Sequence, residues 1–479
     1  MKIKANNDYQ TFTAKVPVVD YDDFSEWIER QKKTEDRVIV SEPVLFYEKT
    51  SGSSAAAKFI PYTKSLKNSF NRMFVIWLAD LLENGPDFKS GKSFISISPA
   101  FHQSQNTERG VQVGLEDDTD YLNPWLKFLT RAFFVLPSSI KKLQNPENFK
   151  RACVVLLLAE KNLEVISIWN PSFLEVLLDF IQANSNLLIA DLRRGSLTVE
   201  NINFNFKQPD ARQLSLLEGN SISWENIWPE LKLISCWTSA NAREGSKRLA
   251  TKFPQVFLQG KGLLATEAPL TLPLIEAKGF VPMLSEVFFE FIDEQGNIKL
   301  LHELNLESEY EVVLTQQGGL YRYRIGDRVR VTGYFKETPC LEFTGRSQAI
   351  CDLVGEKLNE QFVQDCLARL SLQSHFQILL PVIKDTPHYL LLRNSLPFTS
   401  SPDMLEIQLD NLLCEAFHYR QARMLGQLGS VKIRTVANAR DDYYNYFISK
   451  GMKFGDIKHR HLISDIRDAE KLMEKFGLS

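Results

Sequence analysis

Residues 49–63 read KTSGSSAAAKFIPYT and combine a cluster of short hydroxyl side chains, a glycine and Lys58. Apolar residues precede the stretch at 44–46, and a helical pattern follows it from Thr63. Hydroxyl and backbone N–H groups donate to phosphate oxygens, and a glycine lets the backbone come close to them. The stretch therefore predicts a polyphosphate-binding turn between a strand and a helix. No glycine–lysine–serine/threonine run ends it, so it is not a Walker loop, and a hydroxyl-rich surface loop is the alternative.

The composition is that of an ordinary globular protein. Of 479 residues, 44% are hydrophobic and 24% are charged, which is enough to bury a large core. The 56 Lys and Arg against 59 Asp and Glu give a net charge of -3, so no basic field exists to attract nucleic acid. The 6 cysteines form no CxxC pair, which favours reduced thiols in a cytoplasmic protein. The apolar runs are far shorter than the about 20 residues of a membrane span.

The spacing of apolar residues predicts layers of helices and strands in the first part of the chain. Helical patterns cover 64–83, 146–159, 171–181 and 242–252, and strand patterns cover 93–98, 163–169, 231–237 and 256–258. Alternation of this kind is typical of α/β proteins with parallel strands. From residue 286 the pattern changes to strands separated by turn residues, which predicts an antiparallel sheet or a small barrel. These strands are expected at 286–292, 310–315, 328–334 and 341–344.

The pattern changes again after Gly345–Arg346. Helices are expected near 359–370, 403–417, 437–449 and 464–475, and strands near 376–382, 387–393 and 431–434. This predicts a compact α+β unit of its own. We therefore predict a large N-terminal domain over residues 1–345 and a smaller, mobile C-terminal lid domain over residues 346–479.

Residues 259–267 read QGKGLLATE and place a hydroxyl beside a carboxylate. Thr266 can donate to a phosphate. Glu267 can hold Mg²⁺ against phosphate oxygens, because Mg²⁺ is usually bound by few carboxylates together with the phosphates of a substrate. The alternative is a helix cap, for which a Thr–Glu pair is also suitable.

Residues 320–327 read LYRYRIGD, in which aromatic and basic residues alternate. In a strand this pattern places Tyr321 and Tyr323 on one face and the two arginines on the other. Gly326 is expected to turn the chain and leave Asp327 at a strand end, where a carboxylate suits the two hydroxyls of a ribose. An aspartate in a tight turn is the alternative.

Two later stretches add candidate residues. Gly345 can act as a hinge between the domains, and the run GEKLNE at 355–360 follows it. Residues 454–461 read FGDIKHRH, and Lys458 there can neutralise charge that develops on a phosphate. The alternatives are an ordinary interdomain turn and a surface lysine. The two alternating histidines lack a third ligand and do not indicate a metal site.

The order of these motifs resembles the adenylate-forming superfamily of acyl-CoA ligases, luciferases and peptide-synthetase adenylation domains. KGLLATEA at 261–268 and YRYRIGD at 321–327 resemble one branch more closely. This branch is the Gretchen Hagen 3 family of auxin-responsive acyl-acid-amido synthetases, in its bacterial form. The segment VPVVDYDDF at 16–24 also fits the family, and the resemblance runs from about Val16 to the C-terminus.

The resemblance implies a ligase that uses ATP and Mg²⁺ in two half-reactions. A carboxylic acid attacks the α-phosphate to give an acyl-adenylate and pyrophosphate. The small domain then swings about Gly345–Arg346, and the amine of an amino acid forms the amide and releases AMP. The implied roles are phosphate binding by Ser51, Ser53 and Ser54, contact with the α-phosphate by Thr266, Mg²⁺ binding by Glu267, ribose binding by Asp327, positions after the hinge for Arg346 and Lys357, and charge neutralisation by Lys458. The expected partners are these small substrates, with no nucleic acid and no membrane.

The sequence departs from the family pattern at three places. Ala55 and Ala57 stand where a glycine and a proline are common, and Lys458 is followed by His459–Arg460 where a proline is frequent. The family also carries more helix before the segment at 16–24. Two alternatives therefore stay open, an acyl-CoA ligase with a thiol acceptor and a nucleotide-binding protein without catalysis.

Overall fold

The computed structural model describes the chain apart from residues 1–7, 35–37, 50–57, 96–104, 108, 114–132, 220–221, 278, 347–349, 352, 355, 357, 371–375, 384–385, 395–401, 425–426, 453 and 479. The chain packs into two compact units, which divide between Phe343 and Thr344. The sequence also contains acidic residues at 116–120 and a helical pattern at 123–135, and the first stretch and most of the second lie outside the described residues.

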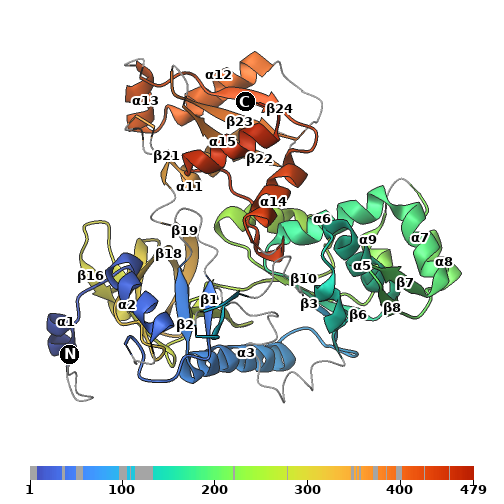
Figure 1. The fold of residues 1–479 in the computed structure, drawn as a ribbon, viewed down its shortest axis with the longest axis horizontal. Helices are drawn as coiled ribbons and strands as arrows, with labels where there is room; N and C mark the ends of the chain where they lie inside the picture. Colours follow the sequence, from blue (N-terminus) through green and yellow to red (C-terminus); the bar gives the residue numbers. More distant parts are fainter. Residues whose placement is uncertain are drawn as a thin grey trace. The chain divides into compact units, whose positions relative to one another are not determined.

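A four-stranded parallel sheet forms one half of the large unit (Figure 1). Its strands, in the order β10-β9-β6-β3, are β3 (Lys92–Ile95), β6 (Leu163–Ser167), β9 (Leu233–Cys236) and β10 (Phe257–Gly260). Every residue of β9 is buried, as is typical of a strand covered on both faces. The helices of this half are α5 (Pro146–Ala159), α6 (Pro171–Ala183), α7 (Ser185–Arg194), α8 (Ala211–Ser215), α9 (Trp224–Ile227) and α10 (Arg243–Lys252). The predicted α/β layers are confirmed.

Local sequence signals explain where the main helices begin. Asn145 and Asn170 cap α5 and α6 with their side chains, and each is followed by a proline in the first helical turn. Thr63 caps the long helix α3 (Lys64–Asn84), because its hydroxyl accepts from the backbone N–H of Leu66 at 3.2 Å. Helix α3 ends at Gly85. These bounds confirm the helices predicted over 64–83, 146–159 and 171–181.

A five-stranded antiparallel sheet forms the other half of the large unit. Its strands, in the order β16-β15-β17-β18-β19, are β15 (Val287–Ile292), β16 (Ile298–Leu300), β17 (Glu309–Gln316), β18 (Tyr323–Phe335) and β19 (Thr338–Arg346). The N-terminal helices α1 (Tyr9–Lys15) and α2 (Tyr21–Lys33) lie beside it (Figure 1). Phe24 of α2 stacks on Tyr323 at 5.4 Å. The predicted antiparallel sheet is confirmed.

Smaller sheets complete the large unit. One has the order β2-β1-β5-β4, with β1 (Phe46–Lys49), β2 (Phe59–Tyr62), β4 (Gln105–Asn106) and β5 (Gln112–Val113). The others are two-stranded, namely β7 (Ser196–Val199) with β8 (Ile202–Asn205), β11 (Leu264–Ala265) with β12 (Ala268–Pro269), and β13 (Thr271–Pro273) with β14 (Phe280–Pro282). Helix α3 joins the halves, because Phe70 stacks on Tyr62 of β2 at 5.9 Å and Trp77 donates to Gln259 of β10 at 2.9 Å.

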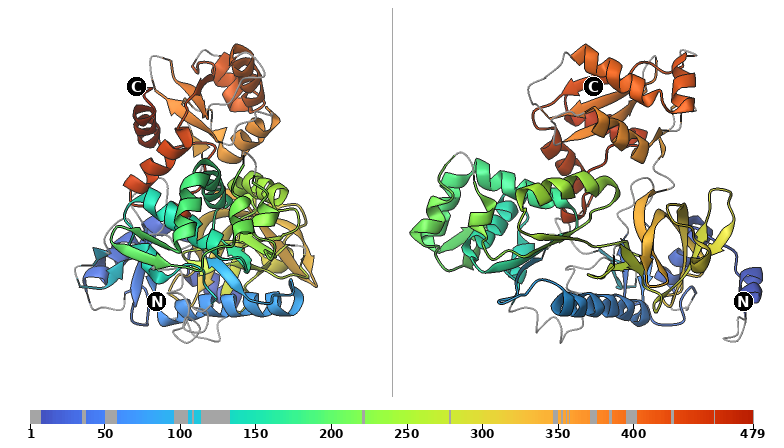
Figure 2. Two further views of the ribbon diagram at one scale, coloured as in Figure 1. Left: turned by 90° about the vertical axis from the view of Figure 1, so that its right-hand side faces the viewer. Right: turned by 180° about the vertical axis from the view of Figure 1, so that it is seen from behind.

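The second unit is a three-stranded sheet with helices on both sides (Figure 2). Strands β22 (Gln377–Val382) and β23 (His388–Arg393) are antiparallel, and β24 (Lys432–Thr435) joins β23 in parallel. The helices are α11 (Glu360–Arg369), α12 (Pro402–Leu413), α13 (Phe417–Met424), α14 (Ala439–Ser449) and α15 (Ile466–Lys475), and a short pair β20 (Ile350–Cys351) and β21 (Leu358–Asn359) precedes them. The predicted α+β pattern after residue 346 is present in this unit.

Within the described part of the chain, no single helix has the length and apolar character needed to cross a membrane. Helices α6 and α7, taken together, have the required length and composition, but the chain bends by 87° between them.

Candidate active site

The hydroxyl-rich stretch connects two strands of one sheet. Ser51, Ser53 and Ser54 lie outside the described residues. On either side of them β1 and β2 pair in antiparallel fashion, with Lys49 opposite Phe59. The predicted strand–turn–helix order is wrong here, because β2 comes between the stretch and α3. Residues 59–62 read FIPY, in which Pro61 disfavours a strand, and the segment forms one through its pairing with β1.

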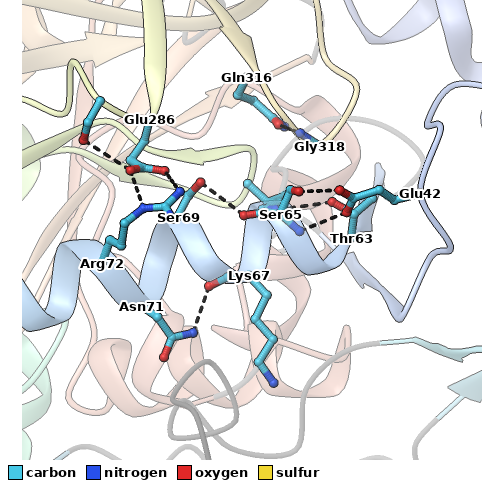
Figure 3. Close-up of polar contacts among 12 residues, drawn as sticks. Glu42, Thr63, Ser65, Lys67, Ser69, Asn71, Arg72, Glu286, Gln316 and Gly318 are labelled. Atoms are coloured by element: carbon cyan, nitrogen blue, oxygen red, sulfur yellow. Dashed lines mark hydrogen bonds and ion pairs between the residues drawn. The ribbon is translucent and has the colours of Figure 1, made fainter.

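The N-terminus of α3 is occupied by a carboxylate of the chain itself (Figure 3). Glu42 accepts from the backbone N–H of Ser65 at 3.0 Å and from its hydroxyl. The hydrogen bonds from the Ser65 side chain and backbone hold the pKa of Glu42 below its usual range. A helix N-terminus attracts anions, and here that anion is Glu42. A phosphate held by the preceding stretch therefore depends on the stretch itself and not on this helix end.

Thr266 and Glu267 form the turn of a small hairpin between β11 and β12. The phenol of Tyr62 donates to the carbonyl of Thr266 at 2.6 Å, and the amide of Gln316 donates to the carbonyl of Glu267 at 3.1 Å. The other end of the Gln316 amide accepts from the backbone of Gly318 (Figure 3). The alternative of a helix cap is wrong, because a strand follows the pair. The turn is therefore fixed through both carbonyls by side chains that are distant in sequence.

The environment of Glu267 fits Mg²⁺. Glu267 is only 8% exposed, and its backbone is fixed, so little freedom remains to be lost when it binds an ion. Among the described residues, no group of three or more His, Cys, Asp or Glu side chains is placed to hold a metal. Mg²⁺ is typically bound through one or two carboxylates, with waters and substrate phosphates as the other ligands. A single buried carboxylate on a rigid turn has this character.

Asp327 lies inside a strand and not at its end. Strand β18 continues to Phe335, so the prediction that Gly326 turns the chain is wrong. The pairing of β17 with β18 shifts between residues 311 and 313, so residues 325–327 lie opposite one residue of β17. Such a bulge bends the strand and re-aims a side chain. Gly326 has a φ of +79°, which suits glycine, and Asp327 is only 3% exposed.

Arg322 breaks the predicted alternation of faces in this motif. Its φ is +49°, an uncommon value for a residue with a side chain. Tyr321 is therefore 48% exposed whereas Tyr323 is fully buried. The Arg322 guanidinium donates to Glu290 at 2.8 Å and to the carbonyl of Val16 at 2.7 Å. The prediction that Tyr321 and Tyr323 share a face is wrong, because one residue leaves the strand conformation between them.

The remaining predicted residues belong to the second unit. Gly345 has a φ of +150° near the end of β19. The side chain of Arg346 and the whole of Lys357 lie outside the described residues. Lys458 is an exposed residue, and its carbonyl accepts from the phenol of Tyr443 at 2.7 Å. The backbone of Lys458 is thus anchored at the surface of the second unit, and its role in catalysis stays a prediction.

The histidine that follows Lys458 has a structural role. One ring nitrogen of His459 lies 2.8 Å from the carbonyl of Gln377, and the ring stacks on Phe376 at 4.8 Å. These contacts account for His459 without a metal. They hold the segment after Lys458 against β22 in the place where a proline is common in the family.

Several residues at the site were not identified from the sequence. Tyr62 and Gln316 act through their contacts with the Thr266–Glu267 turn, and nothing local in the sequence indicates this. The sequence does hold a signal for a further group, because Ser-x-Trp occurs at 167–169 and again at 235–237. Both copies stand at the carboxyl ends of neighbouring parallel strands.

The fold is similar to those of two ligases of known structure. The chain aligns with the structure of 2-hydroxyisobutyryl-CoA ligase in its postadenylation state with a TM-score of 0.53, at 12% identity, over 98% of this chain and 84% of that one. It aligns with the AtGH3.15 acyl acid amido synthetase in complex with 2,4-DB with a TM-score of 0.85, at 20% identity, over 98% and 88%. These likenesses show the fold.

The chain belongs to the GH3 family. Models of this family match in chain order, the N-terminal domain at residues 1–258, the central domain at 280–346 and the C-terminal domain at 357–466. The 4-substituted benzoates-glutamate ligase GH3.12 of Arabidopsis thaliana is 22% identical over 94% of this chain and 87% of its own length. The jasmonoyl--L-amino acid synthetase JAR6 of Nicotiana attenuata is 24% identical over 91% and 82%. The family resemblance seen in the sequence is confirmed, and the chain is a ligase.

Proposed function

We propose that this protein adenylates a carboxylic acid with ATP and Mg²⁺ and then joins the acyl group to an amino acid. A carboxylate oxygen attacks the α-phosphorus, and the bond to the leaving pyrophosphate breaks. The amine nitrogen then attacks the acyl carbon, AMP leaves, and one amine proton passes to the solvent. Membership of the GH3 family, whose curated relatives are amido synthetases and ligases, supports an amine acceptor over the thiol of coenzyme A.

The rigid Thr266–Glu267 turn is the observation that carries the proposal. Its two carbonyls are held at 2.6 and 3.1 Å by Tyr62 and Gln316, so the backbone that carries the two side chains is fixed before any substrate arrives. Catalysis of phosphate chemistry depends mainly on such positioning and on electrostatic stabilisation. We assign Thr266 to the α-phosphate and Glu267 to Mg²⁺, which would neutralise charge on the phosphates when bound.

The other roles follow from residue type and position. Asp327 binds the ribose, since a buried carboxylate on a bulge can accept from two hydroxyls without competition from water. Ser51, Ser53 and Ser54 bind phosphates. From the second unit, Lys458 offsets charge during adenylation, and Arg346 and Lys357 act close to the hinge at Gly345. We infer a reducing, cytoplasmic location from the six cysteines, which form no disulfide among the residues that the structure describes.

Pyrophosphate release separates this function from its rivals. The protein is incubated with ATP, Mg²⁺ and a panel of aryl and alkyl acids, with mixed amino acids, with coenzyme A, or with neither. We expect release with at least one acid and an amide product only when amino acids are present. A thioester product would make the protein an acyl-CoA ligase. ATP binding without release with any acid would favour the non-catalytic alternative.

A further inference from the structure

Three tryptophans and a lysine gather at the carboxyl end of the parallel sheet. We call Trp77, Trp169, Trp237 and Lys261 the tryptophan–lysine site. The ammonium of Lys261 lies 5.1 Å from the Trp169 ring and 5.5 Å from the Trp77 ring, and the rings of Trp169 and Trp237 are 5.6 Å apart. A lysine near aromatic faces at this distance is attracted by them. All four residues are partly exposed, so the group is accessible to a small molecule.

A polar row lies behind the tryptophans. Ser167, Ser235 and Gln259 are register partners across β6, β9 and β10, and therefore point to one face of the sheet. Trp169 and Trp237 stand two residues further along the chain, just beyond the ends of β6 and β9, and the backbone N–H of Trp237 donates to the carbonyl of Trp169 at 2.8 Å. The side chains thus change from polar to aromatic toward the carboxyl ends of the strands.

One hydroxyl of this row has unused hydrogen-bonding capacity. Ser235 is fully buried, and its hydroxyl has no hydrogen-bond partner among the residues that the structure describes. Buried polar groups are normally paired, so such a group calls for an explanation. Its register partner Ser167 accepts from the ammonium of Lys261 at 2.8 Å. A hydroxyl, a lysine ammonium and a second hydroxyl therefore lie close together at the start of the aromatic surface.

The direction of the sheet orients a ligand on this surface. In parallel α/β sheets, ligands bind beyond the carboxyl ends of the strands. Thr266 and Glu267 follow the carboxyl end of β10 in the chain, whereas Ser167 and Ser235 lie one step back within the strands. A flat acid on the tryptophans would direct its reacting carboxylate toward the carboxyl edge and its opposite end toward the serines and Lys261.

We infer that the tryptophan–lysine site binds the acyl acid and selects a flat aromatic acid whose ring carries a hydrogen-bond-accepting substituent, such as a hydroxyl. This inference rests on the proposed function. Trp169 and Trp237 contact the ring, and Lys261 with Ser235 binds the substituent. An aliphatic acid lacks the flat surface, and an unsubstituted aromatic acid leaves the buried Ser235 hydroxyl unpaired.

The test combines binding with catalysis. Quenching of tryptophan emission by benzoate, 3- and 4-hydroxybenzoate and hexanoate measures binding without ATP, and pyrophosphate release gives KM for each acid. We expect at least one hydroxybenzoate to have a KM about tenfold or more below that of benzoate, because hydrogen bonds to charged groups discriminate at this level. Hexanoate is expected to be the poorest acid of the panel.

Variants separate binding from folding. Lys261→Met should remove the preference for hydroxybenzoate, and Lys261→Arg should keep part of it because the charge stays. Lys207→Met, an exposed lysine outside the site, is the matched control. Ser235→Ala should lower the preference while leaving the urea midpoint unchanged or raised, since the lost hydroxyl has no partner in the described structure. A merely structural serine would not behave in this way.

The outcomes of the two assays are distinct. Equal preference in wild type and Lys261→Met, or preference for hexanoate, would overturn the inference and leave the proposed function intact. Selective quenching by hydroxybenzoate without pyrophosphate release would support the site and overturn the adenylation proposal. Absence of quenching by any aromatic acid, together with release driven by alkyl acids, would place the acyl acid elsewhere.

Discussion

The parallel and the antiparallel sheet of the large unit stabilise buried charges in different ways. In the parallel half, Glu164 of β6 accepts from the backbone N–H groups of residues 89–91 and from the ammonium of Lys232 at 2.9 Å. In the antiparallel half, Glu290 of β15 pairs with Arg322, which also binds the carbonyl of Val16. Glu164 is thus enclosed by one turn and a neighbouring lysine. The partner of Glu290, Arg322, also links the N-terminal segment to the sheet.

The two halves also differ in how regular their backbone is. The strands of the parallel sheet are short, and β9 is buried throughout. The antiparallel half has a residue with positive φ at Arg322, directly before β18, and a bulge that includes Asp327, within the same motif. Irregular backbone is costly and persists where the surrounding contacts enforce it. The comparison therefore indicates that the Arg322 contacts hold the strand that carries the proposed ribose-binding residue.

The largest expected effect is on the buried pair of the antiparallel half. Arg322→Met would leave Glu290, which is 1% exposed, without its counter-charge, and we expect a loss of about 3–5 kcal/mol in the free energy of unfolding. Urea unfolding of the wild type and the variant measures this loss. Arg330→Met removes a partly exposed arginine of β18 whose partner Glu309 is also partly exposed, and it should cost about 1 kcal/mol or less. Equal losses in the two variants would contradict the special role of Arg322.

The carboxylate of the parallel half should appear in the pH dependence of stability. Burial alone would raise the pKa of Glu164, but the hydrogen bonds from Lys232 and the backbone outweigh it and lower the pKa to about 2. The unfolded chain, with a pKa near 4.5, binds a proton first as the pH falls. The stabilisation, about 3 kcal/mol, is therefore complete above pH 4.5 and is lost progressively toward pH 2.

Glu164→Gln tests this directly. The slope of unfolding free energy against pH between 5 and 3 should become flatter in this variant, as measured by urea unfolding at each pH. Glu147→Gln, which changes an exposed carboxylate at the start of α5, is the control and should keep the wild-type slope. An unchanged slope in Glu164→Gln would mean that Glu164 does not titrate in this range.

The next prediction concerns catalysis by Asp327, the carboxylate on the bulge of β18. Asp327→Asn keeps the shape of the side chain but removes the charge that accepts from the ribose, and we expect kcat/KM for ATP to fall about 100-fold. The KM for the acid should change little. Asp365→Asn, on the exposed face of α11, is the control. If 2′-deoxy-ATP and ATP lose activity by different factors in Asp327→Asn, the contact is with that hydroxyl; an unchanged kcat/KM for ATP would exclude Asp327 from the ribose site.

The sequence predicts the regular parts of this molecule well, because helices such as 64–83 and strands such as 286–292 follow from local periodicity. It also proposes Thr266, Glu267 and Asp327 as site residues through family-like motifs, and their roles stay predictions. It fails where a conformation depends on distant partners. Residues 59–62 form a strand because they pair with β1, and Arg322 leaves the strand because Glu290 and Val16 bind it. Neither partner lies within a local window.

The smallest expected effect comes from the hydrogen bond between Tyr62 and the Thr266–Glu267 turn. Tyr62→Phe removes the hydrogen bond to the Thr266 carbonyl but keeps the stacking of the ring on Phe46 and Phe70. We expect a loss of about 1 kcal/mol in stability, the usual contribution of one neutral hydrogen bond. If the turn positions Thr266 for phosphate chemistry, kcat for pyrophosphate release should fall several-fold while the KM for the acid stays constant. A variant that loses stability but keeps its kcat would show that the hydrogen bond from Tyr62 supports the fold alone.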